Sequence, residues 1–442
     1  MLPAETRVPT SIDIDWLRNA VADLFAHNRV TRRERSGCEL TYHAPSLGPF
    51  PGRYPHQWFW DSCAHAIALC HIDVSMARQE VLSLLAAQDK QGFIPHLVFN
   101  PARMHPLDHL AARLHPFLTH SPYLQPPVLA QAVQAAHTKE PSREFLASVL
   151  PGLKTYYRYL SRTRDRAGDG LLEIVHSFES GKDRSREYDE VYGRRLGLGI
   201  RAAPMWVLVA RQRSLGWDME RIFHSDIFRV KDLLFNCVYA RNLSVLAQLC
   251  RDAGEDAESE YFAAQTVRTE AAILGKMYDP ENGLFYSLDA RRDADRQIKV
   301  STVSTFLPLL LDSITREQVG RLIEQHLASD AEYWLDYPVP SEPLDSPEAG
   351  WRWTGLWRGL QTWVFLNWFI FRGLLKQAQR FEDRRPRYRD LARQLAERTY
   401  EMVRAAGFRE YYHSVTGKGD RALDFGMSAL VLDMVIGLEQ GG

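Results

Sequence analysis

The sequence predicts an all-α fold built from antiparallel helices. Apolar residues recur at helical spacing through most of its 442 residues, and the first such face comprises Leu17, Val21, Leu24 and Phe25. Signals for β-strands are sparse by comparison. No linker rich in glycine or serine, internal repeat or low-complexity tract divides the chain. These three observations favour one helical domain over residues 1–442.

Further helices are expected in order along the chain. The long segment 142–164 contains Pro151, which would kink or break a helix, and 242–277 is interrupted near Gly254. Segment 355–377 is apolar on nearly every side, which is typical of a helix buried all round. Shorter helices are predicted over 128–137, 316–327, 387–405 and 427–438.

Four long loops rich in proline and aromatic residues separate these helices. They cover residues 42–60, 94–127, 176–203 and 333–355. Long ordered loops in a helical protein are usually functional, so we expect a site built from loops at one end of the helices. One strand-like segment, 283–287, follows a turn and is expected to form a minor hairpin.

Composition and charge exclude several classes of protein. Lys and Arg together number 54 and Asp and Glu 55, which gives a formal net charge of −1. The chain therefore lacks the basic character that nucleic-acid binding requires. Its hydrophobic fraction of 45% is that of a globular protein rather than of a disordered one.

Neither secretion nor membrane insertion is expected. Residues 1–13 lack the apolar core of a secretory signal, and the most hydrophobic stretch, 362–371, is too short to span a bilayer. The five cysteines are odd in number and form no C-x-x-C motif, so neither a disulfide framework nor a zinc site is indicated. A reducing, cytoplasmic setting fits these features best.

Aromatic and polar side chains alternate from Tyr54 to Ser62, immediately before a helix expected to begin near Asp61. The simpler interpretation is an Asp or Ser helix cap with aromatic packing. The alternative is a sugar platform, because the C–H faces of a pyranose stack on Trp and Tyr while a carboxylate accepts hydrogen bonds from hydroxyls. This segment alone favours the cap.

Three further segments concentrate carboxylates, aromatic residues or both. Residues 179–189 hold four carboxylates and three cations, residues 407–419 place Glu410 beside two tyrosines, and residues 351–363 gather tryptophan and arginine. The simpler interpretations are a solvated loop for 179–189, a connection between helices for 407–419 and core packing for 351–363. The alternative is that one of these carboxyl groups is a general acid, which needs a pKa raised by burial or by a neighbouring carboxylate.

No metal or cofactor is expected. Five histidines fall within 25 residues, and one pair has the i, i+4 spacing that two metal ligands could use; the five are His96, His105, His109, His115 and His120. The H-E-x-x-H pattern is missing, and neighbouring prolines indicate a loop. Gly-rich phosphate loops and the G-x-S-x-G motif are also absent from the sequence.

Two carboxylates far apart in the sequence, with aromatic platforms between them, form the arrangement that glycoside hydrolysis needs. One carboxylic acid protonates the leaving oxygen. The other activates water, or attacks directly, on the opposite face of the ring.

Four segments, in this order, resemble glycoside hydrolase family 63 and its bacterial mannosylglycerate and glucosylglycerate hydrolases. Trp58–Asp61 (WFWD) resembles the family's W-x-W-D segment, and Glu179–Ser185 (ESGKDRS) resembles its E-S-G-x-D-x-S loop. Trp357–Gly359 (WRG) and Glu410–Gly417 (EYYHSVTG) resemble its W-R-G and E-Y-Y/F-N-P-x-T-G segments. A Q-P-P element matches at Gln125, so the resemblance covers almost the whole chain.

This resemblance implies an (α/α)6 barrel with long loops and minor β-hairpins at the active-site end. It also implies an inverting α-glycosidase that needs no metal. Asp183 would be the general acid and Glu410 the general base, roughly 6.5–9.5 Å apart to leave room for water. The sugar subsite would be lined by Tyr54, Trp60, Asp61, Gln125, Trp357, Arg358 and Trp363.

The chain departs from the family pattern at several positions. Three cations, Lys182, Arg184 and Arg186, flank the expected acid and would lower its pKa unless they point away. Gly426 and Met427 stand where the family has an aromatic residue. The glycerate hydrolases grip glycerate with an Arg and a Tyr after the acid, whereas residues 194–205 contain only Arg194, Arg195 and Arg201 as candidates.

We therefore predict a cytoplasmic inverting α-glycosidase that acts on a small α-glucoside or α-mannoside, with glycerate or another anion as the leading aglycone. Its partner is a small carbohydrate rather than a nucleic acid or membrane, and a homo-oligomer is compatible with the sequence. One alternative is an α-glucosidase for gluco-oligosaccharides. Two others are an (α/α)6 sugar epimerase, using histidines such as His96 and His120, and a non-catalytic sugar binder.

Overall fold

The structure is a computed structural model of the whole chain. It describes residues 11–33, 37, 39–49, 52–106, 109, 119–196, 199–349 and 357–440. Trp351 and Trp353 of the tryptophan-rich segment, and His115 of the histidine cluster, lie outside the described residues.

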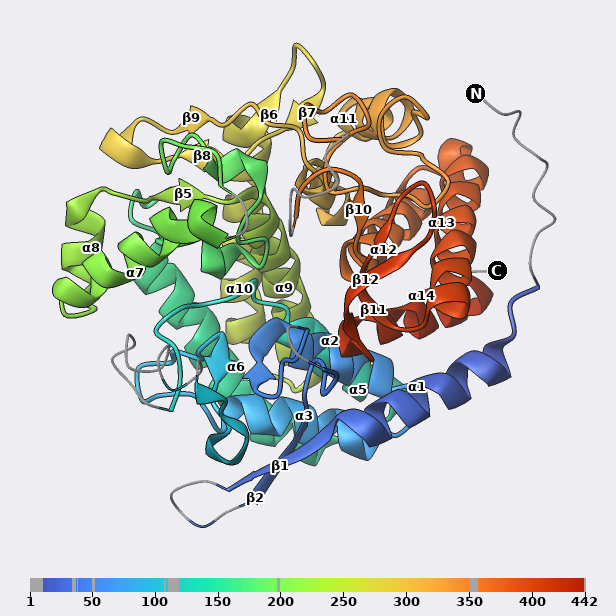
Figure 1. Cartoon of the computed structure of the whole chain (residues 1–442), viewed down its shortest axis with the longest axis horizontal. Helices are drawn as coiled ribbons and strands as arrows, with labels where there is room; N and C mark the ends of the chain where they lie inside the picture. The colour runs from blue at the N-terminus through green and yellow to red at the C-terminus, as the bar shows by residue number, and fades with distance from the viewer. Residues whose placement is uncertain are drawn as a thin grey trace.

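Within the described residues, six helices contact one another in a closed ring. Each contacts the next along the chain, and the last, α14, packs against the first, α2. Figure 1 shows the blue N-terminal helices below, the green segments to the left, the yellow segments along the top, and the red C-terminal helices to the right. The ring consists of α2 (Phe59–Leu69), α5 (Leu129–Lys139), α9 (Leu233–Asp252), the 3-10 helix η7 (Val303–Leu310), α12 (Val364–Arg380) and α14 (Leu430–Gln440).

An outer helix packs against each member of the ring. The pairs are α1 (Ile14–Asn28) on α14, α3 (Val74–Leu85) on α2, α6 (Arg143–Arg164) on α5 and α10 (Asp256–Ala272) on α9. The π-helical η8 (Arg321–Leu327), which continues α11 (Arg316–Gly320), packs on η7, and α13 (Arg385–Ala406) packs on α12. A second π-helical turn, η5 (Ile273–Met277), ends α10.

Small antiparallel sheets and short helices occupy the connections. The strand pairs are β1 (Arg29–Arg33) with β2 (Glu39–His43), β3 (Gln57–Trp58) with β4 (Leu97–Val98), and β6 (Tyr278–Asp279) with β7 (Leu284–Phe285). Two three-stranded sheets comprise β5 (Val230–Lys231), β8 (Leu288–Asp289) and β9 (Arg296–Gln297), and β10 (Gln361–Thr362), β11 (Arg409–His413) and β12 (Gly419–Leu423). The helices here are α7 (Ala203–Ser214), α8 (Met219–Ser225), η1 (Pro101–Arg103), η2 (Ser177–Ser180), η3 (Arg186–Tyr188), η4 (Gly199–Ala202), η6 (Arg291–Asp293), η9 (Glu382–Arg384) and η10 (Gly426–Ala429).

Most of the predicted helices are present, with two differences. The helix α6 runs through Pro151 without a break. The helix expected over 355–377 begins only at Val364, because Trp357 and Gly359 have φ values of 66° and 61° and Gln361–Thr362 pair with β11 instead. The predicted first face is confirmed, since α1 buries Leu17, Val21, Leu24 and Phe25.

The connections between helices alternate in length, and this alternation places the site. A ring helix reaches its outer partner through a few residues, as at 70–73, 140–142 and 253–255. The return from an outer helix to the next ring helix takes far longer, as at 86–128 and 165–232. The long loops therefore gather at the N-terminal ends of the ring helices, as expected for a site at one end.

A buried ion pair joins three of these segments. Arg164, at the end of α6, donates two hydrogen bonds to Glu179, with N–O distances of 2.6 and 2.8 Å, and neither side chain is more than 1% exposed. Glu179 also accepts the backbone N–H groups of Leu124 (3.1 Å) and Val175 (2.8 Å). One carboxylate thus holds the end of an outer helix, the loop before α5 and the loop that contains Asp183.

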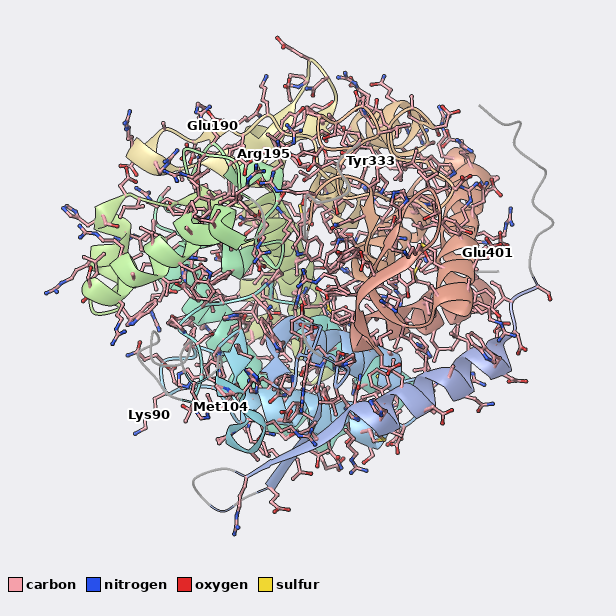
Figure 2. The ribbon with its side chains drawn as sticks, in the orientation of Figure 1. Lys90, Met104, Glu190, Arg195, Tyr333 and Glu401 are labelled. Carbon is pink, nitrogen blue, oxygen red and sulfur yellow. The ribbon has the colours of Figure 1, made fainter. Side chains whose placement is uncertain are left out.

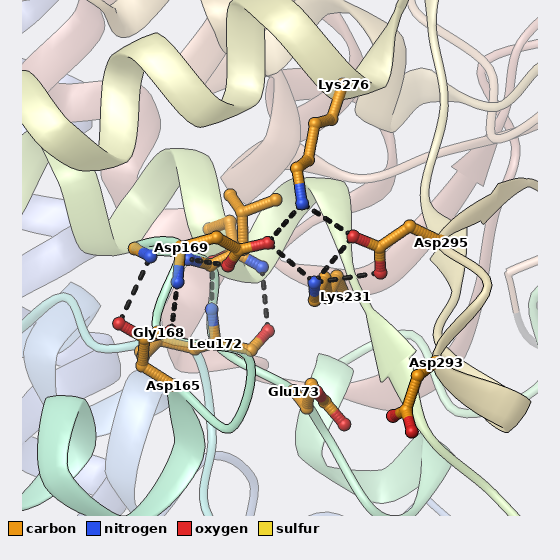
Figure 3. Close-up of polar contacts among 12 residues, drawn as sticks. Asp165, Gly168, Asp169, Leu172, Glu173, Lys231, Lys276, Asp293 and Asp295 are labelled. Carbon is orange, nitrogen blue, oxygen red and sulfur yellow. Dashed lines mark hydrogen bonds and ion pairs between the residues drawn. The ribbon is translucent and has the colours of Figure 1, made fainter.

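A second ion-pair network anchors the start of the same loop. Figure 3 shows the carboxylates of Asp169 and Asp295 bridged by the ammonium groups of Lys231 and Lys276. The buried Lys231, on β5, lies 2.7 Å from Asp169 and 2.8 Å from Asp295. Asp165 accepts the N–H groups of residues 169 and 170. The turn between α6 and the loop is therefore tied to β5, to the residue before β9 and to η5.

One described helix, α9, is long and apolar enough to cross a membrane. Its apolar window is 83% buried inside the protein, as expected for a helix in the inner ring.

Candidate active site

A cavity of about 110 Å³ lies at the N-terminal ends of the ring helices. Aromatic rings make up most of its wall, and three carboxyl groups face into it. Its lining comprises Pro45, Tyr54, Trp58, Trp60, Asp61, Gln125, Gly181, Asp183, Trp357, Trp363, Val364, Phe365, Glu410, Phe425, Met427 and Ser428. All the predicted site residues except Arg358 are therefore brought together, from segments more than 350 residues apart.

Tryptophans from distant segments meet in the wall of the cavity. Trp357 and Trp363 stack with their ring centroids 3.6 Å apart and their planes 5° from parallel. Trp60, in the first turn of α2, lies 6.2 Å from the ring of Trp357. These flat faces can stack on a pyranose ring.

The glycine of the E-S-G segment is required by the packing of Trp60. Gly181 has a φ of 74°, and a Cβ atom added there would lie 2.5 Å from the indole ring of Trp60. A similar restriction applies at Gly426, where a Cβ would lie 2.2 Å from Nε2 of the buried His65. The chain therefore has no space for the aromatic residue that the family places near this position.

Glu410 reaches the cavity from β11. The strand pairs with both β10 and β12, which places Glu410 close to Trp363. The hydroxyl of Tyr54 donates to its carboxylate at 3.1 Å, and the N–H of Ala422 donates at 3.3 Å. Burial raises the pKa of Glu410, and Arg421, 3.8 Å away, opposes that rise.

Asp183 enters the cavity from the loop after Gly181. Burial raises the pKa of its carboxyl, while the charge of Arg184 lowers it by a smaller amount. A carboxyl with a raised pKa can remain protonated near neutral pH and serve as a general acid.

The other two cations of this segment point away from Asp183. The buried Lys182 donates to Asp232 at 2.8 Å, to the hydroxyl of Tyr188 and to Glu187. Arg186 donates to the buried Glu342 at 2.9 Å. Most of the positive charge that the sequence places beside the acid is therefore neutralised by other carboxylates.

Asp61 and Gln125 complete the polar lining. Burial raises the pKa of Asp61 to about 8, so its carboxyl is mainly protonated at neutral pH. The side-chain oxygen of Gln125 accepts the N–H of Trp60 at 3.0 Å, and this bond fixes the amide at the cavity wall.

Arg358 does not line the cavity, contrary to the expectation from the W-R-G segment. Its fully buried guanidinium donates to Asp189 (3.0 Å), to Glu348 (3.3 Å) and to the carbonyl of Arg184 (2.7 Å). Arg358 thus supports the backbone next to Asp183 from behind. Residue type alone could not show this, because its partners are distant in the sequence.

Several residues at the cavity were not singled out from the sequence. Trp58 and Phe425 line it, and Arg421 lies beside Glu410. Trp58 belongs to the W-x-W-D segment and could have been chosen on that ground. A partly buried tyrosine, Tyr192, also follows the acid, just before the range 194–205.

Arg195, His96 and His120 lie elsewhere. Arg195 pairs with Glu348 at 2.7 Å and lies on the same side of the molecule as Tyr333 (Figure 2). His96 is hydrogen-bonded to Ser121, and neither His96 nor His120 is among the described residues that line the cavity. The histidine pair of a sugar epimerase is therefore not found in this cavity.

The chain matches a known family over most of its length. Residues 54–428 match the model of the mannosylglycerate hydrolase MGH1-like glycoside hydrolase domain. The chain belongs to this family. It is therefore a glycoside hydrolase, as the four motifs predicted.

Relatives with assigned activities cover almost the same span. The chain is 30% identical over 424 residues to a mannosylglycerate hydrolase of Rubrobacter radiotolerans, covering 88% of this chain and 92% of the other. It is 26% identical over 427 residues to a glucosylglycerate hydrolase of Mycolicibacterium hassiacum, covering 86% and 90%.

Solved structures share the fold. The crystal structure of the family 63 mannosylglycerate hydrolase from Thermus thermophilus, in complex with Tris and D-glycerate, superposes with a TM-score of 0.80. It is 26% identical, and the match covers 95% of this chain and 100% of the other. The neutral trehalase Nth1 of Saccharomyces cerevisiae, 14% identical, shares the fold alone, with a TM-score of 0.58. The predicted (α/α)6 barrel is confirmed.

We expect Gly181→Ala to destabilise the fold more than Gly168→Ala does. Both glycines have positive φ, at 74° and 64°, but only Gly181 contacts a ring, whereas a Cβ at Gly168 meets nothing within 4 Å. The positive φ costs roughly 1–2 kcal/mol at either position, and the collision with Trp60 adds about 1–3 kcal/mol. Urea denaturation of the two variants measures the difference. Equal losses would contradict the close packing of Gly181 on Trp60.

Proposed function

We propose that the protein is an inverting α-glycosidase that hydrolyses an α-mannosyl or α-glucosyl glycerate. The observation that carries this proposal is the placement of Asp183 and Glu410 in one aromatic-walled cavity, each with a raised pKa. These are the two carboxyl groups that glycoside hydrolysis requires.

Asp183 acts as the general acid in this proposal and Glu410 as the general base. Asp183 donates its proton to the glycosidic oxygen as the bond to the sugar breaks. Glu410 removes a proton from the water that attacks the anomeric carbon on the opposite face. We expect the two carboxyl groups to lie roughly 6.5–9.5 Å apart, the separation at which a water molecule fits between base and sugar.

The sugar would stack within the tryptophan walls and bond to the polar lining. Trp60, Trp357 and Trp363 offer the flat faces, while Asp61 and Gln125 face the hydroxyl groups. Tyr54 lines the same cavity and orients Glu410 through its hydrogen bond. Arg358 acts as a positioning residue, since it holds the carbonyl of Arg184 beside the acid.

Arg184 is our candidate for the group that neutralises the carboxylate of the aglycone. Its charge acts on Asp183, so it lies near the point where the leaving group departs. Its buried Nε has no hydrogen-bond partner among the described residues. The curated relatives act on mannosylglycerate and glucosylglycerate, whose aglycone is an anion.

We further propose that the enzyme works in the cytoplasm without a cofactor. The four cysteines in the described part of the chain are buried free thiols, which suits a reducing compartment. Two carboxyl groups suffice for the acid–base steps.

Asp183→Asn and Glu410→Gln should each lower kcat by about 10²–10⁴-fold, the usual contribution of general acid or base catalysis. The assay is release of sugar and glycerate from mannosylglycerate and glucosylglycerate, with circular dichroism to confirm folding. Asp420→Asn, an exposed carboxylate on β12, is the matched control and should retain activity.

Proton NMR during hydrolysis should show the β-anomer of the sugar as the first product. An initial α-anomer would overturn the inverting mechanism. Full activity in either active-site variant would overturn the assignment of acid and base. Hydrolysis of gluco-oligosaccharides but not of glycerate glycosides would favour the oligosaccharide alternative, and no hydrolysis of any α-glycoside would favour a sugar binder.

Arg184→Gln should lower kcat/KM for the glycerate glycoside by about 10–100-fold, because a hydrogen bond to a charged group contributes about 1.5–3 kcal/mol. The uncharged methyl glycoside of the same sugar should show a much smaller change. The ratio between the two substrates cancels any effect of Arg184 on the pKa of Asp183. An equal loss on both would refute a role for Arg184 in holding the aglycone.

Arg421→Gln should move the acidic limb of the pH–kcat/KM profile to higher pH. Glu410 must be ionised to act as the base, so activity rises as pH increases through its pKa. Arg421 lowers that pKa, and its removal raises it further. The basic limb, which reports ionisation of the acid Asp183, should stay in place. An unchanged acidic limb would show that Glu410 does not set it.

A further inference from the structure

A second and larger cavity lies at the opposite end of the barrel. Its volume is about 630 Å³, and all six ring helices contribute to its lining. We call it the base cavity. On α2, Asp61 faces the catalytic cavity and His71, just beyond the helix, faces the base cavity. Ten residues of helix separate them, which corresponds to about 15 Å.

Basic side chains from three ring helices face the base cavity. Lys139 of α5, Arg241 of α9, and Arg372 and Lys376 of α12 all line it. Arg372 is neutralised by the buried Asp433, at 2.7 Å, which also accepts Trp368 Nε1 (2.6 Å) and His71 Nε2 (2.9 Å). These three donors and the resulting low pKa of Asp433, about 2, make this part of the wall a closed network.

Arg241 has no such partner. Its guanidinium, on a half-buried residue, lines the cavity and makes no hydrogen bond or ion pair with any residue in the described part of the chain. Lys376 has one, the half-exposed Asp312 at 2.6 Å. The nearby Glu270 is occupied by the backbone N–H groups of residues 312 and 313. Since Arg241 lies in the middle of α9, it cannot cap the free carbonyl groups at the end of that helix.

Arg241 and Lys376 also repel each other. Burial lowers the pKa of both side chains, and the charge of Arg241 lowers that of Lys376 further. The charges of Asp312 and Glu270 oppose part of this shift, but neither carboxylate accepts a hydrogen bond from Arg241. A group with two negative charges in the cavity would bond to both cations at once.

We propose that the base cavity binds a phosphoryl dianion, held between the guanidinium of Arg241 and the ammonium of Lys376. The planar fork of an arginine matches two oxygens of such a group. The side chains of Gln134 and Gln379, which line the same cavity, can donate to the remaining oxygens or bind an attached polar group. This site is separate from the catalytic cavity and does not depend on the proposed reaction.

The test is calorimetric titration of the whole protein with inorganic phosphate at constant ionic strength. Saturable binding at one site is expected, and Arg241→Met should weaken it by at least about tenfold. Arg251→Met removes an exposed arginine from the same helix and should leave binding unchanged. No saturable binding, or equal binding by Arg241→Met, would overturn the proposal. Lys376→Met replaces Arg241→Met if the latter fails to fold.

Thermal melting gives a second and independent readout. Saturating phosphate should raise the Tm of the wild type and not that of Arg241→Met. A variant whose Tm rises with phosphate as much as that of the wild type would contradict a site at Arg241.

Three further probes define the ligand. Tighter binding of a hexose phosphate than of inorganic phosphate, sensitive to Arg241→Met, would identify a phosphorylated metabolite as the occupant. Equal binding would identify free phosphate. An unphosphorylated hexose should not bind at this site. Glycerate binding as tightly as phosphate, with the same sensitivity to Arg241→Met, would overturn the assignment to a dianion.

Discussion

The buried pair of Arg164 and Glu179 is the interaction on which the catalytic cavity depends. An ion pair removed from water is stable only where good geometry and additional hydrogen bonds satisfy both partners, and Glu179 receives four donor groups. Through the N–H of Leu124 it fixes the neighbouring Gln125, whose side chain holds the N–H of Trp60. Through its own loop it fixes Gly181, which packs on the ring of the same tryptophan. The glutamate of the E-S-G segment is therefore structural, and it positions both the acid loop and the aromatic wall that faces it.

The dense run of charges around Asp183 forms a frame rather than a solvated loop. Lys182 turns inward to Asp232, which also caps the N-terminus of α9, and Arg186 reaches the buried Glu342. Because these cations are neutralised elsewhere, burial remains the largest influence on the pKa of Asp183. The same pairs join the acid loop to two neighbouring segments. Charge that would weaken the acid if it faced the cavity instead holds the acid in place.

Helical periodicity predicted the barrel well where apolar residues repeat over several turns, as in α1, α6 and α9. It failed at α3, where the buried face includes Glu80, whose carboxylate is satisfied by His43. It also missed β3 and β4, because strands of two residues leave no alternating pattern. At the site, the residues that the family motifs predicted, apart from Arg358, line one cavity. The place of Arg358 could not be predicted, since its partner Asp189 is 169 residues away in the sequence and only the folded chain brings them together.

The aromatic walls influence both binding and acidity. The ring helices direct their N-termini at the catalytic cavity, and this end of a helix carries a partial positive charge that favours carboxylates. Asp61 lies in the first turn of α2, yet its pKa is raised to about 8, so the loss of water among the rings outweighs the helix dipole. The same exclusion of water raises the pKa of Asp183 and of Glu410. In the proposed mechanism, the tryptophans that stack on the sugar would thus also favour a protonated carboxyl group beside it. The proposed base must instead be ionised, and at Glu410 the charge of Arg421 and the N–H of Ala422 oppose the rise in pKa that burial causes. The few polar groups that act on each buried carboxyl group therefore bear on which of the two proposed tasks it can perform.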